Sequence, residues 1–229
     1  MSGIAEPYFD GREMLMIHDM LRREFGLMPS VIRGVAAGDR ERAQVVAGHI
    51  QGIAAVLHHH HHGEDENVWP FLVKHVPDEV APVVRLMEDQ HEVIAKLGSE
   101  IDATLGAWLG DPTAEAREVL ADALDRFLPP LKEHLGIEEE CVVPLMEQHV
   151  TATEWNRMIQ ASAAEVDPEA LPLAFGMLMY EGDPEIVDLA ISNMPPEVAP
   201  VIRRVAAQAF AAHSELIHGT STPPRSTEL

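Results

Sequence analysis

The sequence predicts an all-α protein: an antiparallel four-helix bundle made of two related helical hairpins, followed by additional C-terminal helices. Three observations support this fold class. The 229-residue chain is 46% apolar but only 5% aromatic, a composition typical of helices packed on helices. Apolar residues recur at helical spacing between breaks rich in Gly and Pro. A pattern of residues in the first half recurs about 74 positions later, which indicates two copies of one hairpin.

Four long helices are expected in the first 150 residues, at 11–25, 40–75, 82–109 and 114–149. The first is expected to end near Gly26 and Pro29. Asp39 and Thr113 are suited to cap the second and the fourth. Consecutive prolines at 129–130 are expected to kink or split the fourth helix, about one turn before His134.

Three parts of the chain are expected. Residues 1–150 form the bundle, 151–219 a C-terminal helical extension packed on it, and 220–229 a disordered tail rich in Ser, Thr and Pro. The extension is expected to break into three or four helices at 167–168, 183–184 and 195–196. Residues 194–203 resemble residues 76–85, and continuing that register pairs Ala209 with His91. Because this copy carries no histidine there, we assign the extension a packing role.

The charge excludes several classes of partner. Thirty-eight acidic and 16 basic residues give a formal net charge of −22, which repels nucleic acids and anionic membranes. No stretch approaches the roughly 18 apolar residues of a membrane span, and residues 1–12 do not resemble a secretory signal. The single cysteine, Cys141, is typical of a reducing compartment. These features predict a cytoplasmic protein, either a monomer or a homodimer.

The repeated pattern consists of residues that bind metals. His18 and then His60-x-x-x-Glu64 recur as His91 and then His134-x-x-x-Glu138, in the same order and at nearly the same spacing. On a helix, residues i and i+4 share one face, so each pair can direct an imidazole nitrogen and a carboxylate oxygen to one point. Imidazole combined with carboxylate suits iron, manganese or zinc. The pattern therefore indicates a site for two metal ions inside the bundle.

These residues resemble the hemerythrin/HHE cation-binding family, over roughly Arg12 to Val150. The resemblance implies a non-haem centre of two iron ions, bridged by oxo or hydroxo groups, with manganese or zinc less favoured. Carried over to this sequence, the implied metal ligands are His18, His60, Glu64, His91, His134 and Glu138. Glu64 and Glu138 would be the bridging carboxylates.

Two departures from the oxygen-carrying members of that family affect the expected function. Those proteins have a second histidine four residues from the one on the third helix, but here Met87 and Ala95 occupy those positions. On the fourth helix Glu138 is preferred over Glu139 because it mirrors Glu64. The missing histidine implies an open coordination position, which favours reaction over oxygen carriage. In this respect the pattern looks closer to bacterial, especially actinobacterial, hemerythrin-like proteins.

The expected function follows from that open position. We expect the protein to react with small oxygen species, as a catalase-like di-iron enzyme that decomposes hydrogen peroxide. The alternative is reversible binding or sensing of dioxygen or nitric oxide without turnover. Either way, the expected partner is a small molecule.

Other residues of the same chemical types are interpreted as structural. His58 and His62 are expected to form an exposed pair, and His49 to be a core or rim histidine too far along the helix to join the centre. His75 and His149 are expected to lie at helix C-termini, where imidazolium is favoured. The remaining candidates are Glu88 as a reserve ligand, Cys141 as a buried apolar residue and Tyr180 as a packing residue that could line the pocket.

Overall fold

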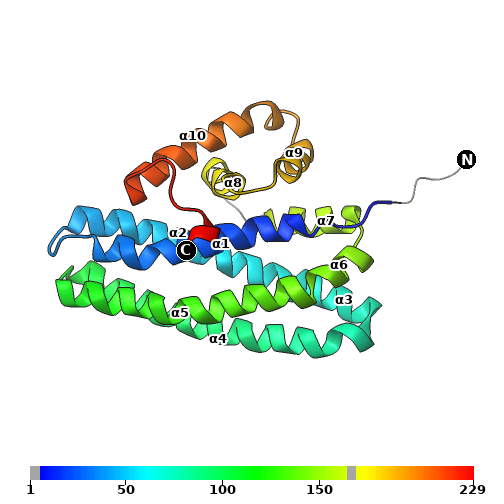
Figure 1. The fold of residues 1–229 in the computed structure, drawn as a ribbon, viewed down its shortest axis with the longest axis horizontal. Coiled ribbons are helices and arrows are strands. Elements are labelled where there is room, and N and C mark those ends of the chain that lie inside the picture. Colours follow the sequence, from blue (N-terminus) through cyan, green and yellow to red (C-terminus); the bar gives the residue numbers. More distant parts are fainter. Residues whose placement is uncertain (1–5, 164–168) are drawn as a thin grey trace, which may run out of the picture.

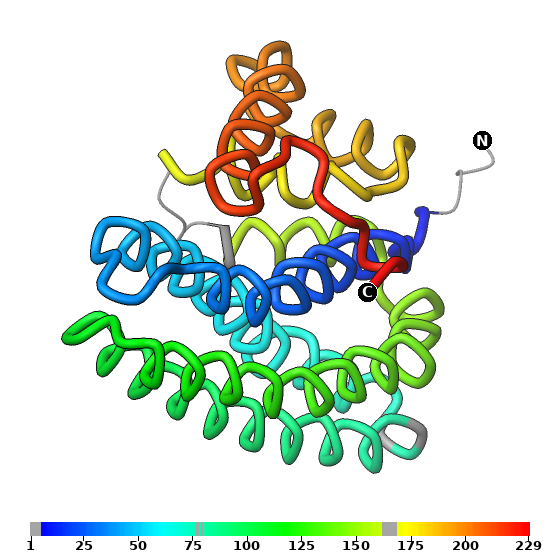
Figure 2. The backbone as a smooth tube through the Cα atoms, turned by 60° about the vertical axis from the view of Figure 1, so that its left-hand side comes forward, coloured from blue at the N-terminus to red at the C-terminus, as the bar shows by residue number. Residues whose placement is uncertain are grey.

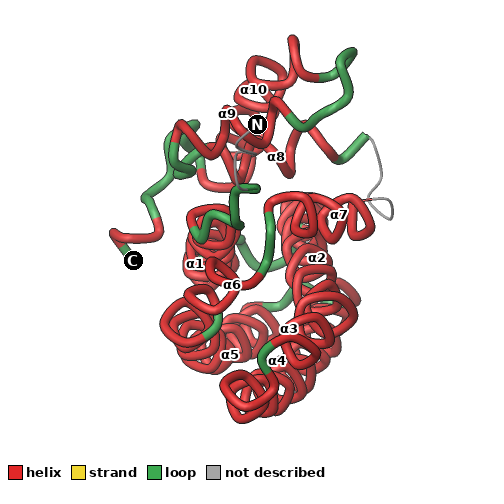
Figure 3. Tube along the Cα trace, turned by 90° about the vertical axis from the view of Figure 1, so that its right-hand side faces the viewer, coloured by secondary structure: helices red, strands yellow, loops and turns green. Residues whose placement is uncertain are grey.

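The computed structural model describes residues 6–163 and 169–229, and within them the fold is all-α, as the sequence predicts. The bundle consists of α1 (Arg12–Arg33), α2 (Arg40–Gly63), α4 (Pro77–Gly110) and α5 (Ala114–Cys141) (Figure 1). The short helices α3 (Trp69–His75) and α6 (Val143–His149) follow α2 and α5. Figure 3 shows the bundle nearly end-on, with α1 beside α2 and α5, and α4 beside α5. Both predicted caps are confirmed, since Asp39 and Thr113 accept hydrogen bonds from the backbone of Arg42 and Ala116.

Prolines lie inside three of these helices without ending them. The prediction that the first helix ends near Gly26 and Pro29 is wrong: α1 continues to Arg33 with Pro29 buried. The α5 helix is not split at Pro129 and Pro130 either. A proline removes one backbone hydrogen bond, and packing of the residues around it outweighs that loss. At the end of α1, Arg33 forms ion pairs with three acidic residues of α5, namely Glu118, Asp122 and Asp125.

A π-helical turn, η1 (Glu64–Val68), joins α2 to α3. In this wider turn the N–H of Trp69 bonds to the carbonyl of Glu64, five residues back. This turn was not expected, because the sequence predicts an uninterrupted helix over residues 40–75. Turns of this kind occur often at functional sites, and this one starts at a predicted metal ligand.

The interior of the bundle contains two apolar clusters with a polar layer between them. The larger cluster includes Leu21, Phe25, Ile50, Trp108 and Phe127. The smaller lies toward the other end and includes Met14, Trp69, Met87, Val142 and Met146. Along the four long helices and the turn after α2, residues of this layer fall between the two clusters: His18, His60, His61, Glu64, His91 and Glu138, with His134 one turn before Glu138. The apolar clusters therefore fix the four helices on both sides of the polar layer.

Four further helices follow: α7 (Ala152–Ala163), α8 (Leu171–Met179), α9 (Pro184–Ser192) and α10 (Ala199–His218). The helices α8, α9 and α10 lie on the side of α1 and α2 away from α4 and α5 (Figure 2). They share a small apolar core of their own, formed by Phe175, Val187, Ile202 and Ala206. The break expected at 167–168 lies outside the described residues. No helix in the described parts of the chain is long and apolar enough to cross a membrane.

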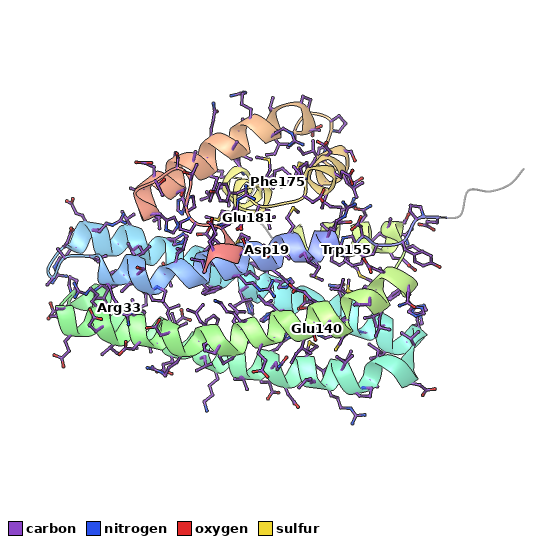
Figure 4. All side chains as sticks on the ribbon, in the orientation of Figure 1. Asp19, Arg33, Glu140, Trp155, Phe175 and Glu181 are labelled. Atoms are coloured by element: carbon purple, nitrogen blue, oxygen red, sulfur yellow. The ribbon has the colours of Figure 1, made fainter. Side chains whose placement is uncertain are left out.

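Residues 220–229 differ from the expected disordered tail, because they run back along α1. Ser226, in the short 3-10 helix η2 (Ser226–Glu228), bonds to Glu181 through its N–H and its hydroxyl, at 2.6 and 3.0 Å. Its hydroxyl also lies 3.3 Å from Asp19 of α1; Figure 4 labels Asp19 and Glu181 in this contact zone. Specific polar contacts hold this segment, and its Ser- and Pro-rich composition did not indicate them.

Candidate metal centre

The polar layer brings all six predicted site residues together, in two groups that share Glu64. One group consists of His18, His60, Glu64 and Glu138, and the other of His61, Glu64, His91 and His134. Within each group, one ligand atom from every residue lies within 4.8 Å of the others. The two oxygens of Glu64 divide between them, since Oε1 lies 3.2 Å from Nε2 of His60 and Oε2 lies 3.4 Å from Nε2 of His91. The carboxylate of Glu64 thus presents one oxygen to each group.

His61 belongs to the second group, and the sequence reading did not include it. The 74-residue repeat assigns one histidine to each helix, and the counterpart of His61 is Leu135, so the repeat gives no sign of it. The side chain is nevertheless buried, and its ring stacks on that of His91 with centroids 4.0 Å apart. A local signal was present: His61 precedes Glu64 by three residues, a spacing that also places two side chains on one helix face.

Buried polar atoms without hydrogen-bond partners concentrate in these two groups. Among the described residues, nine buried side-chain nitrogen and oxygen atoms lack a partner, and seven of them belong to this layer. They are Nε2 of His61, His91 and His134, and both carboxylate oxygens of Glu64 and Glu138. A buried acceptor left without a partner costs about 1–3 kcal/mol. Bound cations would supply partners to all seven atoms, so the residues fit a pair of metal ions.

The burial of the layer also determines the protonation of its groups. Burial, and next the adjacent charge of Glu138, raises the pKa of Glu64 well above its ordinary value. Burial lowers the pKa of His60 to about 3 and that of His134 to about 4. Both imidazoles are therefore neutral at pH 7, the form that binds metals. Two carboxylates this close repel each other, and cations between them remove that repulsion.

Three of the histidines are held from outside by an oxygen on their Nδ1 atom. The Nδ1 of His18 lies 2.8 Å from Glu139, that of His91 2.9 Å from Asp65, and that of His134 3.2 Å from Gln90. Such a contact fixes the ring orientation and leaves Nε2 free to bind a metal. Arg22 in turn holds Glu139 at 2.7 Å. The rings are thus positioned by their surroundings before any cation is present.

A comparison with known protein families agrees with this geometry. A family model, the Hemerythrin HHE cation binding domain, matches residues 12–115 and 82–162. The chain belongs to the hemerythrin HHE family. The search of curated proteins and the search of solved structures gave no significant match. The comparisons thus support the family and not the narrower resemblance to actinobacterial proteins. The matched residues of this HHE domain include both groups of the polar layer and end before α8.

A cavity leads to the HHE centre between α2 and α4. Its volume is about 750 Å³, within the range of small-molecule pockets. His61, Asp65 and His91 form part of its wall, whereas His18, Glu138 and His134 do not line it. Apolar residues such as Leu57 and Ile94 line another part. The cavity therefore borders two residues of the second group, His61 and His91, and none of the first.

The remaining candidate residues of this HHE protein lie outside both groups. Glu139 contacts the outer nitrogen of His18, and Glu88 lines the cavity. The hydroxyl of Tyr180 donates to the carbonyl of Pro223, away from the centre. The Nδ1 of His75 lies 2.7 Å from the carbonyl of Phe71, as expected at a helix C-terminus. Cys141 is exposed, so its predicted burial is wrong; the helix ends there, and the valines that follow it are buried instead.

Proposed function

We propose that the polar layer of this HHE domain holds two iron ions and that the protein decomposes hydrogen peroxide. The proposed ligands are the six residues named from the sequence, together with His61. His18, His60 and Glu138 would hold one ion and His61, His91 and His134 the other, with Glu64 between them. Five imidazoles and two carboxylates suit iron, and the same donors make manganese or zinc possible but less favoured.

The cavity beside His61 and His91 is the observation that favours peroxide decomposition over reversible binding of dioxygen. Each group offers one ligand atom from four residues, fewer than the six that an octahedral ion accepts, so small molecules have positions to occupy. Even with His61 as a ligand, coordination positions therefore stay open at the second ion. The cavity is far larger than a water molecule, whose share of liquid volume is about 30 Å³. A cavity of this size with charged residues such as Asp65, Glu88 and Glu92 in its wall admits water and protons, which favours turnover over stable storage of dioxygen.

When bound, a pair of iron ions supplies two-electron redox chemistry, by which one peroxide is reduced to two waters and a second is oxidised to dioxygen. The chain's own residues keep the site in position for this. Glu64 places one oxygen toward each group, and Glu139, Asp65 and Gln90 fix three imidazole rings. The apolar clusters on both sides confine access to the cavity wall.

Oxygen evolution tests this proposal. Protein without an added tag, loaded with iron, is mixed with hydrogen peroxide in an oxygen electrode. We expect rapid, repeated turnover that is lost in His60→Ala and in Glu138→Ala, two residues from the group remote from the cavity. Replacing His75, an exposed histidine outside both the cavity and the two ligand groups, by Gln is the control and should leave the rate unchanged. A stable spectrum of bound dioxygen or nitric oxide without turnover would overturn the enzyme and support reversible binding.

A further inference from the structure

A second cluster of buried ligating side chains lies where α10 meets the bundle. Glu24 of α1, His49 of α2 and His218, the last residue of α10, direct their side chains to one point. The side chains of Glu24 and His49 are each only 1% exposed, and that of His218 is 6% exposed. His49 precedes His60 by eleven residues, about 16 Å along a helix, so this cluster is separate from the HHE centre. His218 also lies outside the residues that match the family.

The two distances from Glu24 to the histidines are those of neighbouring ligands around one ion, and all three ligand atoms lie within 4.8 Å of one another. Oε2 of Glu24 lies 3.3 Å from Nε2 of His49 and 3.4 Å from Nε2 of His218. Zinc binds nitrogen and oxygen at about 2.0–2.1 Å, so neighbouring ligands of a tetrahedral zinc stand about 3.3–3.4 Å apart. A charge-assisted hydrogen bond between such atoms would be shorter, at about 2.7–2.9 Å. The spacing therefore suits a shared cation better than direct hydrogen bonds.

Unpartnered atoms point to the same conclusion. Of the nine buried side-chain atoms without a hydrogen-bond partner among the described residues, the two outside the HHE centre are Oε2 of Glu24 and Nε2 of His49. Both are aimed into this cluster. All such atoms thus fall into two places, of which one is the centre described above. In the second place, as in the first, a bound cation would supply the missing partners.

Outer contacts orient the ligands here as they do in the bundle. Nδ1 of His49 lies 3.0 Å from Nε2 of His213, which leaves Nε2 of His49 free to face the cluster. The other oxygen of Glu24 accepts a hydrogen bond from Arg23 at 2.8 Å. Arg42 of α2 donates to the carbonyls of Leu216 and Ile217, so the end of α10 is held beside His49.

We propose that Glu24, His49 and His218 bind one zinc ion, with water as its fourth ligand. Two histidines, a glutamate and a water form a common zinc set. The ion would join α1, α2 and α10 at a single point and so fasten the C-terminal helices to the bundle. This proposal is independent of the iron chemistry, since no residue is shared between the two sites.

Zinc stoichiometry and zinc position test the proposal. Full-length protein without an added tag is first loaded with iron, then equilibrated with zinc, washed and analysed for both metals. We expect one zinc per chain, lost in His218→Gln and in Glu24→Gln while the iron content stays the same. The control replaces His58 and His62, the exposed stacked pair most suited to adventitious zinc, and should retain the zinc. Equal zinc content in His218→Gln and in the unsubstituted protein would contradict the proposal.

A second measurement does not depend on the folding of any variant. Crystals of the unsubstituted, iron-loaded protein grown with zinc are measured on both sides of the zinc absorption edge. We expect an anomalous peak about 2.0–2.1 Å from the three ligand atoms. A peak confined to the bundle centre or to the histidine run would overturn the site. In solution, zinc should also raise the melting temperature of the unsubstituted protein and not that of His218→Gln.

Discussion

The Nδ1 atom of His91 lies 2.9 Å from Oδ1 of Asp65, a residue of the π-helical turn η1. The same carboxylate oxygen accepts a hydrogen bond from the indole of Trp69 at 3.0 Å. Asp65 directly follows Glu64, so two consecutive residues serve different purposes: Glu64 faces the proposed cations, and Asp65 holds a ring that would bind one of them. The π-helical turn links these two purposes within a single segment.

Removing the Asp65 carboxylate should weaken metal binding at the second group. We expect Asp65→Ala to lower iron affinity about 10- to 100-fold, because the ring of His91 loses the contact that orients it. A chelator competition titration measures this, and circular dichroism checks that the helices remain. Glu66→Ala is the matched control, because Glu66 is the next residue, is exposed and belongs to neither ligand group. If both variants bind iron equally well, the contact does not orient the ligand.

Metal content should divide according to the two groups of ligands. We expect His60→Gln and His61→Gln each to reduce bound iron from two equivalents to about one, because each residue belongs to one group only. Glu64→Gln should reduce it by more than either, since Glu64 belongs to both. Iron analysis of protein reconstituted under identical conditions gives these values. Full iron content in His61→Gln would mean that this stacked ring is not a ligand.

Filling the cavity should slow access without removing the metal. Gly98 and Gly106 both lie in α4 with open space where a side chain would begin, but only Gly98 lines the cavity. We expect Gly98→Leu to reduce kcat/KM for peroxide severalfold at unchanged iron content, whereas Gly106→Leu should not change it. Both should gain about 0.5–1 kcal/mol of stability from losing a helical glycine. Equal kinetics in the two variants would show that small molecules enter elsewhere.

The close approach of α8 to α10 leaves no room for a side chain at Gly176. A Cβ added at Gly176 would stand 2.9 Å from the backbone carbonyl carbon of Ala206 and from Cβ of Phe210. We expect Gly176→Ala to destabilise the protein by about 1–3 kcal/mol, by analogy with overpacked cores. Gly52→Ala, on the open side of α2, should instead stabilise it by about 0.5–1 kcal/mol. Thermal unfolding compares the two, and a gain in both would show that α8 can move away from α10.

Local rules predicted much of the fold and of the site. The caps at Asp39 and Thr113 follow from side-chain chemistry, and the bundle follows from helical periodicity and the repeat. The same repeat identified six of the seven residues now placed in the centre. It omitted His61 because a repeat detects only what occurs twice. Only its spacing of three residues from Glu64 indicates His61, the seventh residue. This signal is weaker, because His61 is one of five adjacent histidines.

The parts that were not predicted depend on contacts between distant segments. Nothing near Pro29 shows that α1 will continue, since packing against α5 decides it. The π-helical turn has no local sequence signal, and it lies between two buried side chains, those of His61 and Trp69. Glu24 and His218 meet only because α10 returns to the bundle, and no periodicity relates residues from the two ends of the chain.

The polar layer between the two apolar clusters gives the bundle a weakest cross-section. Without cations, like charges and unsatisfied atoms would push the helices apart at mid-length while both ends stay packed. Amide hydrogens near His91 and His134 should then exchange faster than those near Trp108 or Met146, which lie within the two apolar clusters, and proteases should cut near the layer first. In a cell, a bundle of this design would last longer when iron is plentiful, so the abundance of the protein would follow the supply of its metal.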